Sequence, residues 1–164
     1  MASDLLNQLG SREITKAEVF ERVESDFGLI PQLLEGTSSS KATIRCGCGS
    51  VLVDLSGKHP ERLYPYMDSF IKLLDSKYRI LTWNTMAVIA NLTAVDTEDK
   101  FDAIFDKYYG FLGSKYMVTV SNLVVNSAKI ATNKPYLADK MASELLKVQH
   151  LKTTPHRGMQ TRHS

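Results

Sequence analysis

The sequence predicts an all-α protein organised as a short α-solenoid of about three to four helix pairs. Two observations indicate this fold. Apolar residues recur at helical spacing within residues 79–95, and the same pattern returns about 38 residues upstream and downstream. A repeat of this length, built as a helix, a tight hinge and a second helix, is typical of a stacked array in which each pair packs only against its neighbours.

The second helix of each pair is predicted from three aligned stripes. They are Ile44, Cys48, Val51, Leu52 and Leu55, then Leu81, Thr85, Val88, Ile89 and Leu92, then Thr119, Leu123, Asn126, Ser127 and Ile130. Residues at this spacing share one side of a helix, which is expected to be buried. Residues 116–125 are rich in β-branched side chains and would be assigned to a strand from propensity alone, but the repeat register favours a helix.

The first helices are predicted from a second repeated pattern. The hinge at residues 73–78 returns at residues 111–116, and apolar helical segments precede both copies. Near the amino end we expect short helices at 3–9 and 16–25, the latter starting in a capping box formed by Thr15 and Glu18. Pro31 suits the first turn of a further helix that closes at Gly36.

The remaining boundaries follow from turn and capping residues. Pro60 begins the second pair, and the carboxylates of residues 96–99 crowd the start of the third, where Thr97 is expected to cap. Calcium binding is disfavoured there because the spacing and glycine of a calcium loop are missing.

A last helix is predicted at Tyr136–Gln149. Residues 1–150 therefore form one domain with repeats near 16–57, 58–95, 97–132 and a partial 133–150, followed by a disordered tail at 151–164.

Two motifs resemble known repeats. The pattern Ile44-Arg45-x-x-Cys48-x-x-x-Leu52-x-x-Leu55 resembles the V-R-x-x-A-x-x-x-L-x-x-L second helix of HEAT and armadillo repeats, and Ile30-Pro31-x-Leu33-Leu34 resembles the opening of an armadillo helix. This resemblance implies a right-handed superhelix whose second helices line a concave surface. Thr82 and Val120 stand where such repeats usually have arginine.

Composition limits the functional class. Apolar residues at 43% and charged residues at 23% are ordinary for a soluble protein, and neither a membrane span nor a secretory signal is recognised, so a cytoplasmic protein without membrane partners is expected. The two cysteines, Cys46 and Cys48, point apart on a helix and are expected to be free thiols. Gly47 lies between the two cysteines and Gly49 follows them. We interpret both glycines as sites of close helix packing; the alternative is that residues 46–49 form a loop that binds phosphate or metal.

Projecting the repeat register onto the concave surface gives the candidate site residues Asp54, Asn84, Asn91, Asn122 and Lys129, and Trp83 is added because it lies beside their rows. Asn91 resembles the groove asparagine with which armadillo proteins hold an extended peptide, because an amide can donate and accept at once. Trp83, the only tryptophan, is either buried between repeats or an anchor for a partner.

These features predict a non-catalytic protein-interaction scaffold. No catalytic motif is recognised, and no cofactor or metal is expected. A protein or peptide partner is expected on the concave surface or at the open carboxyl-terminal end, where Tyr136–Gln149 could also mediate homo-oligomers. The alternative is a nucleic-acid-binding protein, because residues 107–164 hold nine basic and two acidic side chains, a net charge of +7.

Overall fold

The computed structural model describes residues 4–153 of the chain, with side chains for residues 4–147. Within these residues the chain is helical and has no strand, which confirms the all-α prediction. The α-helices are α1 Asp4–Gly10, α2 Lys16–Ser25, α3 Ile30–Gly36, α4 Ala42–Lys58, α5 Pro60–Leu63, α6 Met67–Leu73, α7 Arg79–Leu92, α8 Lys100–Ala103, α9 Phe105–Tyr109, α10 Met117–Asn133 and α11 Ala138–Thr153. Five short 3-10 turns connect them, η1 Phe27–Leu29, η2 Tyr64–Tyr66, η3 Thr93–Val95, η4 Gly110–Gly113 and η5 Pro135–Leu137.

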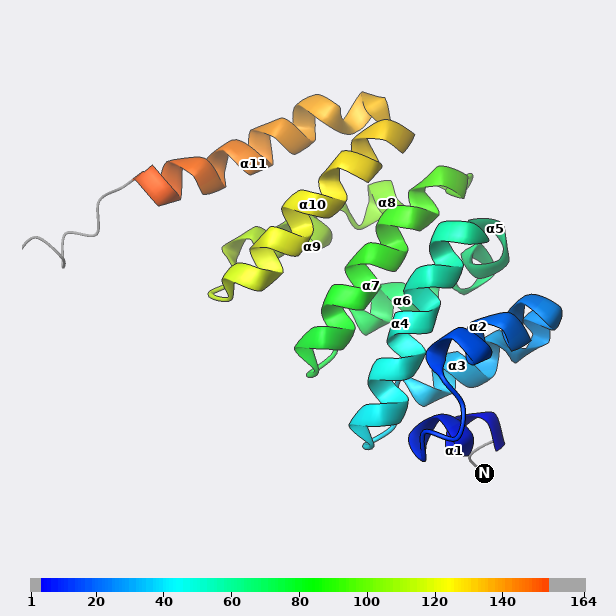
Figure 1. Cartoon of the computed structure of the whole chain (residues 1–164). Coiled ribbons are helices and arrows are strands. Elements are labelled where there is room, and N and C mark those ends of the chain that lie inside the picture. Colours follow the sequence, from blue (N-terminus) through cyan, green and yellow to red (C-terminus); the bar gives the residue numbers. More distant parts are fainter. Residues whose placement is uncertain (1–3, 154–164) are drawn as a thin grey trace, which may run out of the picture.

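The three long helices α4, α7 and α10 lie side by side and run in the same direction (Figure 1). Helix α7 packs between the other two, and the shorter α6 and α9 lie behind this row. Helices α1, α2 and α3 pack on α4, at the amino-terminal end of the row. Helix α11 departs from the end of α10 at the opposite end of the molecule.

The predicted stripes form the buried sides of the long helices. All five stripe residues of α4 and all five of α7 are buried, and in α10 only Asn126 is partly exposed. The β-branched segment predicted to be helical despite its strand propensity is the beginning of α10. Large side chains from the shorter helices complete a single core, among them Met67, Phe70, Phe101, Phe105 and Tyr108. Removal of these apolar surfaces from water is the main force that holds the helices together.

Two helix starts show how local side chains set the boundaries. Helix α2 begins as predicted, because the Thr15 hydroxyl accepts a 3.1 Å hydrogen bond from the Glu18 amide. The predicted Thr97 cap is wrong. Instead, the buried Asp96 carboxylate accepts the amides of Lys100 and Phe101 at 2.9 and 2.8 Å. Asp99 adopts a left-handed backbone conformation, with φ of 52°, at the turn into α8.

The glycines of α4 mark close contacts between helices, as predicted. A Cβ atom added to Gly47 would lie 2.9 Å from Leu9 of α1, and one added to Gly49 would lie 2.5 Å from the Asn84 amide of α7. Residues 42–58 form one continuous helix, so the alternative of a ligand-binding loop is wrong. Both cysteines are free thiols, and burial raises the pKa of Cys48 to about 12.

The last helix extends beyond its predicted end at Gln149. Helix α11 continues to Thr153, and the remainder of the predicted disordered tail, residues 154–164, lies outside the described residues. Leu137 and Met141 are buried against the preceding helices, whereas Leu146 is 61% exposed. None of the helices in the described part of the chain is both long and apolar enough to cross a membrane.

Candidate functional site

The six candidate residues all lie on the three long helices. Asp54 is on α4; Trp83, Asn84 and Asn91 are on α7; Asn122 and Lys129 are on α10. Asp54 and Lys129 are exposed and the other four are partly buried. The structure directly joins one pair of them, because the Lys129 ammonium donates a 2.6 Å hydrogen bond to the Asn91 carbonyl oxygen.

Asn91 links three helices through its amide. While its oxygen accepts from Lys129 of α10, its nitrogen donates a 2.8 Å hydrogen bond to the Ser56 hydroxyl of α4. These residues line a surface depression of about 230 Å³, together with Asn133 and the end of α4. The Asn91 oxygen therefore already has a donor in Lys129, and its amide nitrogen already has an acceptor in Ser56. The amide predicted to hold a peptide is therefore a link between helices in this structure.

The other polar candidates do not form a continuous row. The Asn84 amide packs over Gly49, and the Asn122 amide donates a 2.8 Å hydrogen bond to the Val118 carbonyl of its own helix. Asp54 projects from α4 as an exposed carboxylate.

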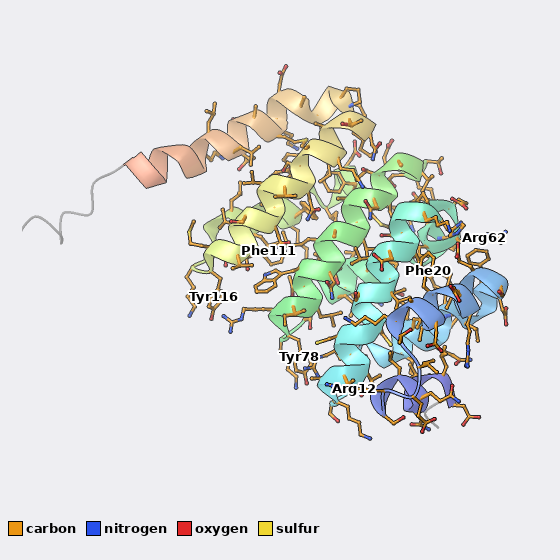
Figure 2. All side chains as sticks on the ribbon, viewed as in Figure 1. Arg12, Phe20, Arg62, Tyr78, Phe111 and Tyr116 are labelled. Atoms are coloured by element: carbon orange, nitrogen blue, oxygen red, sulfur yellow. The ribbon has the colours of Figure 1, made fainter. Side chains whose placement is uncertain are left out.

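Trp83 joins α7 to α10 and also lines a depression. Its indole N–H donates a 2.9 Å hydrogen bond to the Thr119 hydroxyl. Its ring, together with Phe111 and Tyr116, borders a hollow of about 300 Å³, which we call the aromatic depression. The Arg79 guanidinium lies over the Tyr116 ring, 4.0 Å from its centroid. Figure 2 shows Phe111 and Tyr116 beside the beginning of α10.

Three exposed apolar side chains lie on the two helices that border the aromatic depression. Ile80 of α7 is 52% exposed, and Val118 and Val125 of α10 are 51% and 73% exposed. Their helical positions are away from the buried stripes of α7 and α10. We call Ile80, Val118 and Val125 with the aromatic depression the apolar face. Sequence reasoning identified only Trp83 of this group, although the repeated hinge at 111–116 was a usable signal for Phe111 and Tyr116.

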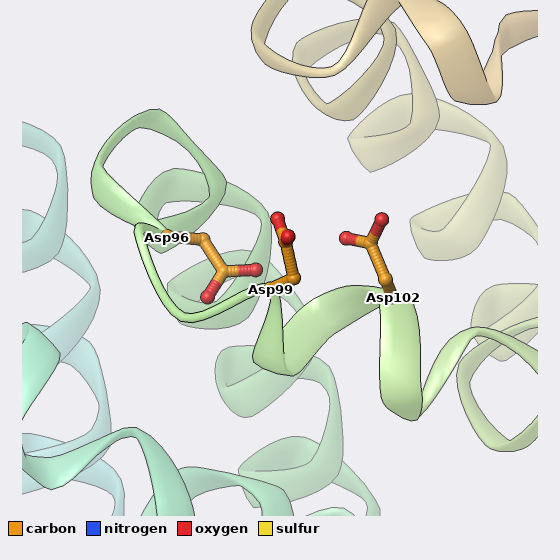
Figure 3. Close-up of side chains that lie close together, drawn as sticks. All are labelled: Asp96, Asp99 and Asp102. Atoms are coloured by element: carbon orange, nitrogen blue, oxygen red, sulfur yellow. The ribbon is translucent and has the colours of Figure 1, made fainter.

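A second cluster of ionisable groups joins α8 to the end of α10. The carboxylates of Asp96, Asp99 and Asp102 converge within 4.8 Å of one another (Figure 3). The Lys134 ammonium lies 3.2, 3.1 and 2.8 Å from them, respectively. Tyr136 donates a further 2.7 Å hydrogen bond to Asp102. Three oxygen donors of this kind could hold a cation, but here a lysine supplies the positive charge.

Electrostatics in this cluster favours the charged forms. Burial alone would lower the pKa of Lys134, but hydrogen bonds to Asp102, Tyr136 and the other two carboxylates outweigh it and raise that pKa. Burial would likewise raise the pKa of Asp102, whereas the hydrogen bonds from Lys134 and Tyr136 lower it overall. The cluster is therefore a structural ion-pair network. Sequence reasoning recognised the carboxylates of residues 96–99 but missed Asp102 and Lys134.

Comparison with known proteins gives no match: neither a family model nor a curated protein nor a solved structure is significantly similar to the chain.

Proposed function

We propose that the chain is a short HEAT/armadillo-like α-solenoid that acts as a non-catalytic protein-interaction scaffold. The recurrence of the helical stripes and the side-by-side packing of α4, α7 and α10 support this architecture. In such an array the long helices offer one extended surface to a partner. The partner is a segment of another protein that binds along α7 and α10.

The observation that carries the proposal is the apolar face. Three side chains about half exposed or more, Ile80, Val118 and Val125, lie on the two helices that border a hollow lined by Trp83, Phe111 and Tyr116. Exposed apolar side chains near a hollow are typical of an interaction site, and large aromatics and arginine contribute most to binding energy. The hollow of about 300 Å³ is large enough for one apolar side chain of a bound segment. The partly buried Asn91 and the exposed Lys129 offer polar contacts farther along the same helices.

The proposal can be tested with peptides selected from a random display library against the whole protein. Trp83 is the only tryptophan, so its fluorescence reports directly on occupation of the aromatic depression. We expect selected peptides to contain a large apolar residue and to lose about tenfold or more in affinity with Ile80→Glu or Val118→Glu. Asp54→Asn, on α4, is the matched control and should bind normally. Peptides whose affinity is unchanged by both apolar-face variants would contradict the proposal.

Nucleic-acid binding remains the alternative because of the basic carboxyl-terminal third. Several of these lysines already have partners: Lys107 pairs with Asp75 at 2.6 Å, Lys129 bonds Asn91, and Lys134 is buried among aspartates. Salt separates the two functions. Binding to phosphates weakens steeply as salt rises, because counterions are released, whereas binding through the apolar face should change little. Fluorescence polarisation of labelled DNA and of a labelled selected peptide, at low and high salt, measures the salt dependence of both affinities.

A further inference from the structure

One side of α10 carries four exposed residues at the spacing of a coiled-coil seam. They are Met117, Ser121, Val124 and Ala128, separated by four, three and four positions. Met117 is 56% exposed and Val124 is 46% exposed. This spacing places all four on one stripe of the helix. We call this stripe the seam.

The seam faces neither the core nor α7. The α10 residues that contact α7 and its following turn lie on a different side of the helix: Thr119 bonds Trp83, Lys129 bonds Asn91, and Asn133 bonds Thr93. Leu123 and Ile130, which are fully buried, mark the core side. The seam is therefore at the outer edge of the row formed by α4, α7 and α10. Helix α11 also contacts α10, but the four seam residues stay exposed beside it.

The seam is also free of charge. Residues 117–128, MVTVSNLVVNSA, contain no ionisable side chain, and Lys129 is the only one in α10. Its ammonium is directed to Asn91 and away from the seam. An exposed helix that faces only water normally carries charged residues on its outer side. Their absence makes this side of α10 a candidate contact surface.

We propose that the seam is the contact surface of a homodimer, in which α10 packs against α10 of a second copy in antiparallel orientation about a two-fold axis. The order of side chains along the seam is large, small, large, small. In the antiparallel pair, Met117 of one copy lies level with Ala128 of the other, and Val124 lies level with Ser121. Every large side chain thus meets a small one, which is the complementarity that close helix packing requires. A two-fold interface must be self-complementary in this way.

The size of the seam predicts a weak, reversible dimer. Only two of its four side chains, Met117 and Val124, are large and apolar, so the seam offers much less than the roughly 800 Å² per partner of a standard interface. We therefore expect a dissociation constant on the order of 10–100 μM. This proposal rests on other residues than the proposed function. The two surfaces adjoin, because Val125 follows Ser121 by four positions and precedes Ala128 by three.

Sedimentation velocity of the whole protein, from about 1 μM to several hundred μM, tests the dimer. We expect the weight-average mass to rise from monomer to dimer over this range. Val124→Glu should keep the protein monomeric at every concentration by placing a charge in the seam. Asp54→Lys, a charge change at an exposed position of α4, should leave dimerisation unchanged. Circular dichroism confirms that both variants are folded. A wild-type protein that stays monomeric, or a dimer that survives Val124→Glu, overturns the proposal.

Disulfide trapping tests the orientation. In a Cys46→Ser background, Met117→Cys protein mixed with Ala128→Cys protein should form a covalent dimer on mild oxidation. Neither variant should do so alone, because residues 117 and 128 are about 16 Å apart along the helix and a disulfide needs Cα atoms within about 7 Å. Efficient crosslinking of either variant alone would overturn the antiparallel pairing while leaving peptide binding by the apolar face untouched.

Discussion

The Lys134 ammonium lies 3.2 Å from the Asp96 carboxylate, and both side chains are almost completely withdrawn from water, at 5% and 0% exposure. The same Asp96 carboxylate accepts the backbone amides of Lys100 and Phe101. One buried pair therefore fixes the beginning of α8 to the end of α10. Ions in such a position depend on their complete set of partners, because water cannot replace a missing one.

Replacing Lys134 with methionine should destabilise the protein strongly. The substitution keeps much of the side-chain volume but leaves Asp96, Asp99 and Asp102 without their common counter-ion. Breaking a buried ion pair from one side typically costs about 3–5 kcal/mol. Urea denaturation of the two proteins at pH 7 measures the difference. Lys107→Met, which removes only the exposed pair with Asp75, is the control and should have a much smaller effect. Equal effects of the two substitutions would contradict the structural role of the cluster.

The same cluster predicts a change in pH dependence. The pKa of Asp102 is lowered in the folded protein, so its contribution to stability is present above its unfolded pKa of about 3.9 and is lost as pH falls through the lower folded value. Lys134 has a raised pKa, so its contribution persists until pH rises above its ordinary value near 10.4. In Lys134→Met the three carboxylates repel one another, and their protonation at low pH relieves this repulsion. The stability difference between the proteins should therefore shrink from pH 7 to pH 4 in urea denaturation; a constant difference would count against this assignment.

Two glycine substitutions in α4 should have opposite effects. Alanine favours a helix by about 1 kcal/mol over glycine. At Gly57 the nearest atom to an added Cβ is 3.7 Å away, so Gly57→Ala should stabilise the protein by about 0.5–1 kcal/mol. At Gly47 the Cβ would meet three atoms of Leu9 at 2.9–3.2 Å, and the overpacking should destabilise by about 1–3 kcal/mol. Thermal denaturation, monitored by circular dichroism, gives the sign of the stability change for each variant. A stabilising Gly47→Ala would show that α1 does not pack as closely as described.

The hydrogen bond between Trp83 and Thr119 should be measurable by a double-mutant cycle. Trp83→Phe removes the donor, Thr119→Val removes the acceptor, and the double variant removes both. We expect a coupling energy of about 1 kcal/mol, which is typical of a hydrogen bond between neutral side chains. Urea denaturation of the four proteins provides the values. Additive effects would show that the two side chains do not interact in solution.

Much of the helical structure could be predicted because it follows from local pattern. The buried stripes, such as Leu81 to Leu92, depend only on the spacing of apolar residues. The start of α10 required more, since its β-branched residues favour a strand; the repeat register correctly overruled propensity. The Thr97 cap failed because Asp99 turns the chain into a left-handed conformation, which brings Asp96 to the helix start instead.

The candidate site was less predictable because it depends on contacts between helices. Asn91 and Lys129 were singled out separately, but their hydrogen bond across α7 and α10 was not foreseen. Lys134 was missed because nothing next to it in the sequence is acidic; its aspartates lie in the preceding helix pair. The exposed side chains of the apolar face carry no local signal either, since an apolar residue in a helix is normally expected to be buried.

In the described part of the chain, no side-chain hydrogen bond joins residues more than 40 positions apart, and most of those between helices join residues 32 to 40 apart. Proteins whose contacts are close in sequence fold quickly, because little chain entropy is lost before the first contacts form. Folding can therefore begin at any adjacent pair of long helices and spread in either direction. Stopped-flow refolding should be complete within milliseconds, and ribosomal synthesis need not finish before the amino-terminal helices are packed.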